Sequence, residues 1–170
     1  NVSAKKEENC FNLVTVGTIE KRKGISYIID AISNIKDKTN VKITFSIVGK
    51  VVEEDYYNNL VEQIKNAGLT DNVKFLGRLS NEELSEVYSK ANCFAFGSQL
   101  EGYGMVLLEA MSYGLPLIAF NNTAMPYTVK DGHNGFLVEN KNTNEFSNAI
   151  LKLIEDPQLC KKLAEGSLND

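Results

Sequence analysis

The fold of this chain is decided by residues 11–48, which read FNLVTVGTIEKRKGISYIIDAISNIKDKTNVKITFSIV. Residues 11–16 are a short apolar, β-branched run closed by Gly17, a pattern typical of a buried strand. Isoleucine then recurs with the i, i+3, i+4 and i+7 spacing of a helix that packs on a sheet, at Ile25, Ile28, Ile29 and Ile32. Residues 41–48 repeat the first run, so this stretch predicts one strand–helix–strand unit.

The alternation of strand and helix continues to the end of the chain. Further strands are expected at residues 73–76, 93–96, 117–120 and 135–138, and helices at 57–64, 84–88, 103–112 and 146–153, with a short one after Pro157. Ser80 and Glu83 form a capping box at the start of the third helix. This order predicts an α/β, Rossmann-like, doubly wound and mostly parallel six-stranded sheet with helices on both faces. We expect a polar segment at residues 1–10 and one domain at 11–170.

Composition excludes several classes of protein. The chain has 170 residues, 43% hydrophobic and 24% charged, which is typical of one globular domain rather than a disordered chain. A net charge of −4 leaves no basic field for nucleic acid, so we expect no nucleic-acid partner. The three cysteines are far apart and the only histidine is His133, so no metal site is predicted and a reducing cytoplasm fits best. No apolar run is long enough to cross a bilayer, no signal peptide is recognised, and the chain starts without Met, so we expect a fragment of a longer protein.

The most informative segment for chemistry is residues 98–111, SQLEGYGMVLLEAM. Two glycines let the backbone approach a ligand, and the helix that they open directs unpaired N–H groups and a positive dipole end at the same place. This arrangement favours a phosphate. A tight strand-to-helix turn without a ligand is the alternative for the same pattern.

Two carboxylates lie within this segment. Glu109 is the only charge between Met105 and Met111 on a helix expected to be largely buried, so it needs a donor such as the hydroxyls of a sugar. Glu101 lies eight positions earlier, which on a helix places it roughly 10 Å away, at the opposite end of a diphosphate. The alternative is that Glu109 forms a salt bridge with a lysine and Glu101 is solvated.

A basic turn and a histidine complete the candidates. Residues 21–24, KRKG, follow the first strand, where a cation can hold a diphosphate leaving group; a solvated basic turn is the alternative. His133 lies between Gly132 and Asn134 and reads as an exposed loop residue rather than a catalytic base, and Cys93 reads as a small buried side chain.

An ordered set of motifs resembles a known family. The set comprises Val16-Gly17 with Lys23-Gly24, residues 73–77 as V-x-F-x-G, Glu101 to Glu109 as E-x7-E, residues 114–119 GLPLIA and residues 131–138 DGHNGFLV. Over residues 12–163 the chain resembles the C-terminal, donor-binding domain of GT-B-type retaining glycosyltransferases, specifically glycosyltransferase family 4.

The resemblance implies a role for each matching position. Glu101 and Lys23 would be catalytic. Substrate binding would fall to Gly17, Thr18, Arg22, Arg78, Leu79, Gly102, Tyr103, Gly104, Met105, Val106 and Glu109. Within this set Glu109 would bind the ribose, Glu101 and residues 102–104 the donor sugar, the amides of Met105 and Val106 and the Lys23 side chain the phosphates, and residues 78–79 the nucleobase.

The same resemblance implies partners and a reaction. The partner would be a nucleotide-diphosphate sugar whose hexose-type sugar passes to a glycan, lipid or other acceptor, with no metal and no cofactor. The N-terminal, acceptor-binding domain would be missing from this chain. The protein would be cytoplasmic, with any peripheral contact to the inner face of the membrane made through that missing half.

Three departures from the family pattern keep an alternative open. Thr18 stands where the family has Arg, so Arg22 or Lys21 must substitute; residues 97–98 are Gly-Ser rather than Pro-Ser; and a glutamate is absent at residues 126–127. A non-catalytic nucleotide-sugar-binding module is therefore the alternative function. A dinucleotide-dependent oxidoreductase would need G-x-G-x-x-G after the first strand, where residues 17–22 read GTIEKR.

Overall fold

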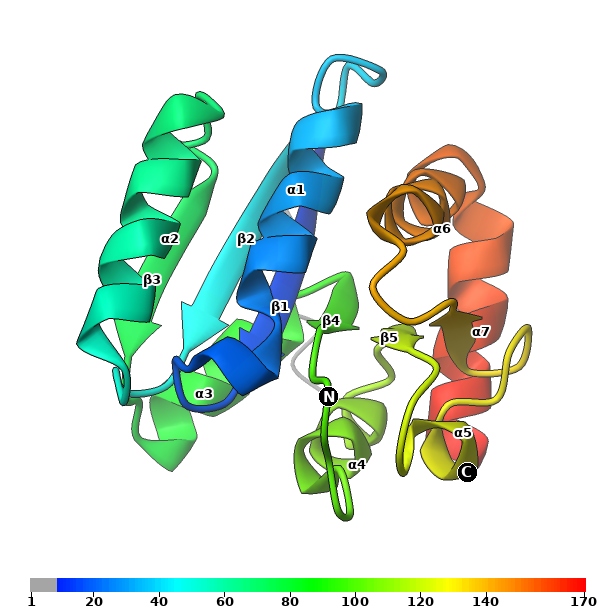
Figure 1. The fold of residues 1–170 in the computed structure, drawn as a ribbon. Helices are drawn as coiled ribbons and strands as arrows, with labels where there is room; N and C mark the ends of the chain where they lie inside the picture. The colour runs from blue at the N-terminus through cyan, green and yellow to red at the C-terminus, as the bar shows by residue number, and fades with distance from the viewer. Residues whose placement is uncertain (1–8) are drawn as a thin grey trace.

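The computed structural model describes residues 9–170, and in it six parallel strands form one sheet (Figure 1). The strands are β1 (Cys10–Val16), β2 (Lys42–Val48), β3 (Val73–Gly77), β4 (Cys93–Phe96), β5 (Leu117–Phe120) and β6 (Gly135–Val138). Their spatial order is β3-β2-β1-β4-β5-β6, and every neighbouring pair is parallel. The predicted six-stranded, Rossmann-like sheet is confirmed.

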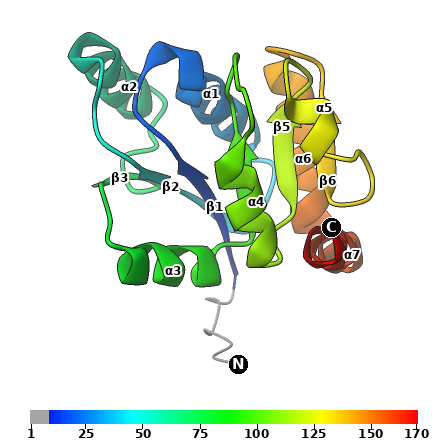
Figure 2. The same cartoon turned by 90° about the horizontal axis from the view of Figure 1, so that it is seen from below.

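Helices cover both faces of the sheet, as predicted (Figure 2). They are α1 (Ile25–Ile35), α2 (Glu54–Asn66), α3 (Asn81–Lys90), α4 (Met105–Ser112), α5 (Met125–Thr128), α6 (Thr143–Glu155) and α7 (Pro157–Asn169), with a 3₁₀ turn η1 (Lys21–Lys23). α1, α2 and α6 pack on one face, and α3 and α4 pack on the other. α7 contacts both α4 and α6.

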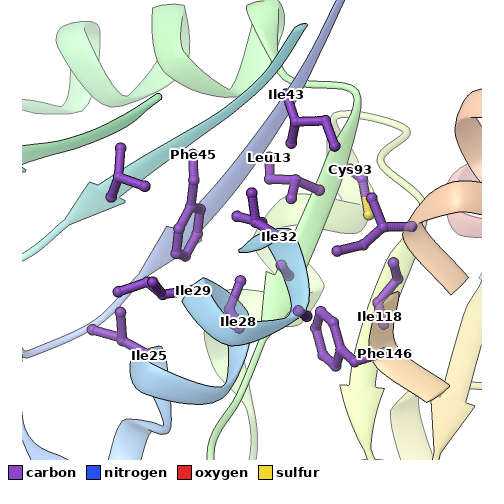
Figure 3. Packing of buried hydrophobic residues seen from close by; sticks show 14 of the residues in the cluster. Leu13, Ile25, Ile28, Ile29, Ile32, Ile43, Phe45, Cys93, Ile118 and Phe146 are labelled. Atoms are coloured by element: carbon purple, nitrogen blue, oxygen red, sulfur yellow. The ribbon is translucent and has the colours of Figure 1, made fainter. Parts of the chain in front are cut away.

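Each face has its own hydrophobic core because successive side chains of a strand point to opposite faces. In β1, Leu13 belongs to the core under α1, whereas Val14 belongs to the core under α3 and α4. The isoleucine stripe of α1 packs against Leu13 and Phe45 of the sheet (Figure 3). Cys93 is completely buried in this core, as expected, and burial raises the pKa of its thiol.

The structure changes the bounds of several expected elements and adds two short ones. β1 begins at Cys10, inside the expected polar segment, of which residues 1–8 lie outside the described part of the chain. The helix expected from residue 103 begins at Met105, because Gly104 takes a left-handed φ of 61° and residues 101–104 form a loop. The last helix is a full 13 residues, and the short elements η1 and α5 were not predicted.

Candidate functional site

The carboxyl ends of β1 and β4 lie side by side at the point where the strand order reverses, which is where open α/β sheets bind ligands. The loops that follow these strands touch through their backbones. A Cβ atom at Gly24, whose φ is 65°, would lie 1.9 Å from the carbonyl oxygen of Gly97. Only residues without side chains allow this approach, and it brings the basic turn η1 against the loop that carries Glu101.

Lys23 and Glu101 form the centre of the site. Lys23 Nζ lies 2.6 Å from Glu101 Oε1, and the side chains are 16% and 14% exposed. Arg22 Nη1 lies 3.6 Å from the same oxygen, and the Ser98 hydroxyl donates a hydrogen bond to it at 3.0 Å. The structure therefore brings the two residues predicted to be catalytic together, and Glu101 is an ion-paired carboxylate rather than a solvated one.

The loop after β5 holds the Glu101 loop in place. Glu101 N–H donates to Thr123 Oγ1 at 3.1 Å, and the Thr123 hydroxyl donates to Asn122 Oδ1 at 2.9 Å. Asn122 Nδ2 donates to the carbonyl oxygen of Ser98 at 3.0 Å. Sequence reasoning missed this pair; the only signal was a polar Asn-Asn-Thr run directly after an apolar strand.

The amino end of α4 opens at the same edge. Gly104, the N-cap residue, has no side chain to cap the first amides of the helix, so the N–H groups of Met105 and Val106 are left without a side-chain cap. The side chains of Tyr103 and Met105 are 85% and 68% exposed, so the loop and the first turn form an open surface. This geometry fits the predicted phosphate cradle, while the binding roles of residues 102–106 stay predictions.

The expectation for Glu109 was wrong in one respect. α4 buries Leu107, Ala110 and Met111 but exposes the opposite side, on which Glu109 lies. Among the described residues Glu109 makes no salt bridge, and its Oε2 accepts a long hydrogen bond of 3.5 Å from the hydroxyl of Tyr88. Because a short helix packs through one stripe only, the isolated charge did not indicate burial.

The spacing of the two carboxylates also needs correction. The predicted separation of roughly 10 Å assumed helical rise across all eight residue steps from Glu101 to Glu109. Since α4 starts at Met105, half of those steps lie in the loop, and the helical rise does not apply to Glu101.

Tyr88 is a residue that sequence reasoning assigned only to a helix stripe. It is completely buried, it stacks on Tyr113 with ring centroids 4.9 Å apart, and its hydroxyl reaches Glu109. Burial, with a further contribution from the nearby Glu109 carboxylate, raises the pKa of Tyr88 far above its usual range, so this phenol stays a neutral donor.

Arg22 links the basic turn to the Glu101 loop. Its Nε lies 3.2 Å from Glu20 Oε1, and its Nη1 donates to the carbonyl oxygen of Leu100 at 2.8 Å. The hydroxyl of Thr18 donates to the other oxygen of Glu20, and this bond together with Arg22 lowers the pKa of Glu20. Arg22 is therefore the second cation at the site, beside Lys23. The family pattern has its arginine at position 18 instead, where this chain has Thr.

The remaining predicted contacts lie along the rim. The Lys23 side chain passes over Gly17, at 3.7 Å from the position that a Cβ would take. Arg78 is exposed and Leu79 is half-buried against the core under α3 and α4. Their predicted role at the nucleobase is not tested by this geometry.

His133 lies away from this edge. Its loop precedes β6 and so lies at the amino ends of the strands, where its exposed ring nitrogen Nε2 is 3.1 Å from Asp170. The structure thus places it as an exposed loop residue, as expected.

The site is a surface edge rather than an enclosed pocket. A cavity of about 10 Å³ lies beside Gly17, Thr18 and Lys23, whereas hollows of about 520 and 580 Å³ lie elsewhere, between β6 and α6 and at the amino ends of the strands. Among the described residues, the lining of the larger hollows includes no ion pair and no uncapped helix amino end, so chemistry rather than volume identifies the site.

Within residues 9–170, no group of three or more His, Cys, Asp or Glu side chains is arranged to hold a metal ion. In the same residues no helix has the length and the apolar character that a bilayer crossing requires.

Comparison with known proteins gives consistent matches. Residues 2–169 match the model of the protein family described as "Glycosyl transferases group 1". An uncharacterized glycosyltransferase of Methanocaldococcus jannaschii is 32% identical over 154 residues, which cover 89% of this chain and 40% of that protein.

Solved structures agree with the sequence match. The Anabaena protein HepE in complex with UDP has a TM-score of 0.87 at 29% identity, covering 95% of this chain and 43% of HepE. The C-terminal domain of a glycosyl transferase group 1 family protein (LpcC) from Francisella tularensis has a TM-score of 0.85 at 28% identity, covering 94% of this chain and 83% of that domain. The chain thus spans about two fifths of the length of the longer relatives.

Proposed function

The chain belongs to the glycosyl transferases group 1 family and has the fold of the C-terminal domain of a GT-B glycosyltransferase, and from this premise we propose that it binds the nucleotide-sugar donor of a transferase. The transferase moves a hexose-type sugar to a glycan, lipid or other acceptor with retention at the anomeric carbon, as in glycosyltransferase family 4. The observation that carries the proposal is the pairing of Lys23 with Glu101 beside the uncapped end of α4.

The residues divide the donor between them. Lys23, Arg22 and the amides of Met105 and Val106 bind the diphosphate, since cations and a helix amino end both favour phosphate oxygens. Glu101 and residues 102–104 face the sugar, and Glu109 accepts hydrogen bonds from the ribose. An exposed Glu109 suits this role, because its carboxylate is open to a ligand while one of its oxygens accepts a hydrogen bond from the Tyr88 hydroxyl.

The chemistry follows from where charge develops. When the acceptor oxygen bonds to the anomeric carbon, the bond from that carbon to the diphosphate breaks and its electron pair stays on the diphosphate oxygen. The acceptor proton leaves to the released diphosphate or to water. Lys23 and the α4 amides stabilise the growing negative charge, so no metal ion or cofactor is part of the proposal.

The donor class draws support from the relatives. HepE has been crystallised with UDP and with UDP-glucose, so UDP and a glucose-type sugar are the first ligands to try. Because this chain spans only part of such proteins, we assign acceptor binding to a separate N-terminal domain. We place the whole protein in the cytoplasm, and any membrane contact would be made through that domain.

A non-catalytic nucleotide-sugar-binding module is the second candidate, and Thr18 at the usual arginine position favours it. Arg22 weakens this reading, since it already lies within 3.6 Å of Glu101. Transfer by the chain joined to its acceptor half would separate the two.

Calorimetry on the 170-residue chain tests the proposal. We expect one nucleoside diphosphate from a panel of UDP, GDP and ADP to bind, together with its sugar ester, while the matching nucleoside binds much more weakly. A chain that binds none of these ligands would refute the donor role, and equal binding of nucleoside and diphosphate would remove the phosphate cradle from it.

A further inference from the structure

One carboxylate oxygen lies at the centre of the charge distribution of the site. Glu101 Oε1 lies 2.6 Å from Lys23 Nζ and 3.6 Å from Arg22 Nη1, and the Ser98 hydroxyl donates to it at 3.0 Å. The two cations that would hold a diphosphate therefore already share an anion. With Glu101 included, these three side chains carry a net charge of one positive unit rather than two, and Glu20, whose Oε1 lies 3.2 Å from Arg22 Nε, brings the local sum to zero.

Hydrogen bonds to both its side chain and its backbone hold Glu101 in this position. Ser98, which bonds the carboxylate, is 1% exposed, and the backbone N–H of Glu101 donates to Thr123 at 3.1 Å. The Lys23–Glu101 pair itself is only about one-seventh exposed, so water screens its charges weakly. The negative charge consequently stays at the mouth when a ligand arrives.

The substrate and the product of the proposed reaction differ in charge. A nucleoside diphosphate esterified to a sugar carries two negative charges, whereas the released diphosphate gains a third once its terminal phosphate, with a second pKa of about 6, is ionised. The additional charge appears on the oxygen that the sugar has just left. Glu101 faces the sugar in the proposed function, so the new charge develops beside this carboxylate.

We propose that Glu101 acts as a fixed counter-charge that makes the donor site prefer the nucleotide sugar over the nucleoside diphosphate product. This inference rests on the proposed donor function and adds a specificity role for that same residue. The like charges repel, which raises the dissociation rate of the trianionic product. The dianionic substrate has its sugar, and not an ionised oxygen, beside Glu101, so it is repelled less.

The test compares two isosteric variants of the 170-residue chain, Glu101→Gln and Glu109→Gln, by calorimetry with UDP and UDP-glucose at about pH 8. For Glu101→Gln we expect UDP to bind at least about fivefold tighter than to the wild type, since a like charge about 4 Å away weakens binding by about a factor of five even in bulk water. UDP-glucose should not gain by the same factor. Glu109→Gln removes an equal charge from the same edge. Among residues 9–170 no cation forms an ion pair with Glu109, so this variant should not bind UDP more tightly than the wild type does.

A pH series adds a second readout. Near pH 5.5 the terminal phosphate of UDP takes up its proton, so the gain of Glu101→Gln over the wild type should shrink, whereas a purely structural effect of the substitution would not follow that titration. Circular dichroism checks that each variant is folded, and Glu101→Ala provides a second neutral side chain.

The outcomes are distinct. UDP affinity that is unchanged or weaker in both Glu101 variants would overturn the proposal, and so would equal tightening by Glu109→Gln. Failure of the wild-type chain to bind any nucleoside diphosphate of the UDP, GDP and ADP panel, or its sugar ester, would instead refute the proposed donor function. If GDP and GDP-mannose are the pair that binds in the first experiment, they replace UDP and UDP-glucose without other change.

Discussion

At the level of single residues, Lys23 offers the sharpest comparison because its neighbour Lys21 lies in the same short turn η1. Lys21 is exposed and makes no ion pair among the described residues, whereas Lys23 is paired at the mouth of the site. We expect Lys23→Ala to weaken a nucleoside diphosphate by about 1.5–3 kcal/mol, the range for a charged hydrogen bond, and to leave the nucleoside nearly unaffected. Calorimetry with both ligands measures this.

Lys21→Ala is the matched control. It should change the affinities for the nucleoside diphosphate and for the nucleoside only by the small amount expected for loss of an exposed charge. If Lys21→Ala and Lys23→Ala cause equal losses, the effect is one of general charge, and Lys23 has no direct contact with phosphate.

Glu109 carries the prediction for the ribose. We expect Glu109→Gln to weaken UDP by about 1–3 kcal/mol while the fold is retained, because the side chain is exposed in the unliganded chain. The loss should disappear with the 2′,3′-dideoxy analogue of UDP, which lacks the hydroxyls that the carboxylate would accept from. A loss of the same size with that analogue would contradict the ribose contact.

Thr123 combines backbone strain with a contact to the site. Its φ of 41° is unfavourable for a β-branched residue, yet its hydroxyl holds the N–H of Glu101. We expect Thr123→Gly to leave the free energy of unfolding unchanged or higher, because it relieves the strain, and to weaken UDP-glucose about three- to tenfold through loss of the hydroxyl.

Thr123→Ser keeps the hydroxyl and should keep the affinity for UDP-glucose, as measured by calorimetry beside thermal unfolding. Weak binding by the Ser variant would mean that Thr123 acts through its methyl group and not by positioning Glu101.

At the level of elements, the site depends on how closely the loops after β1 and β4 approach. A Cβ at Gly97 would lie 2.4 Å from the carbonyl oxygen of Gly24, which forces the two loops apart. We expect Gly97→Ala to lower the free energy of unfolding by about 1–3 kcal/mol, the usual effect of overpacking, and to weaken UDP binding because Lys23 and Glu101 separate. Thermal unfolding and calorimetry together measure both effects.

Gly102→Ala is the control in the same loop, since a Cβ there meets nothing within 4 Å. It should leave the free energy of unfolding almost unchanged. Equal destabilisation by the two alanines would show that loop flexibility, and not the Gly24–Gly97 contact, sets stability here.

At the level of the whole molecule, the proposed function makes the chain one half of a two-domain transferase. It spans 40% of its Methanocaldococcus relative and 43% of HepE, and its site is an open edge. Holding an acceptor hydroxyl against the anomeric carbon is worth roughly 7–11 kcal/mol of the barrier, and an open edge cannot supply that positioning. We therefore expect the chain to bind its nucleotide sugar but not to transfer the sugar.

The measurement is product formation from the best-binding nucleotide sugar and candidate acceptors, with and without an added acceptor-binding half. Rapid transfer by the 170-residue chain alone would contradict the proposal that donor and acceptor are bound by separate domains, and with it the assignment of this chain to donor binding.

Most of the fold was predictable because hydrophobic periodicity is a local property. The isoleucine stripe of α1, the apolar runs of the six strands and the Ser80 capping box, in which Ser80 Oγ accepts from Glu83 N–H at 3.2 Å, all appear where the sequence predicts them. The start of α4 was missed by two residues, since the backbone of Gly104 rather than any side chain ends the preceding loop.

The sequence by itself determined the fold class, the edge of the sheet that carries the site and the motifs that show the family, because each is written in neighbouring residues. Only the tertiary structure decided that Glu109 is exposed, that Thr123 accepts a hydrogen bond from the Glu101 loop and that Glu101 forms an ion pair with Lys23. Lys23 and Glu101 are 78 positions apart, and they meet because two glycine loops touch across adjacent parallel strands. Such contacts depend on how the strands are ordered in space, which no local pattern specifies.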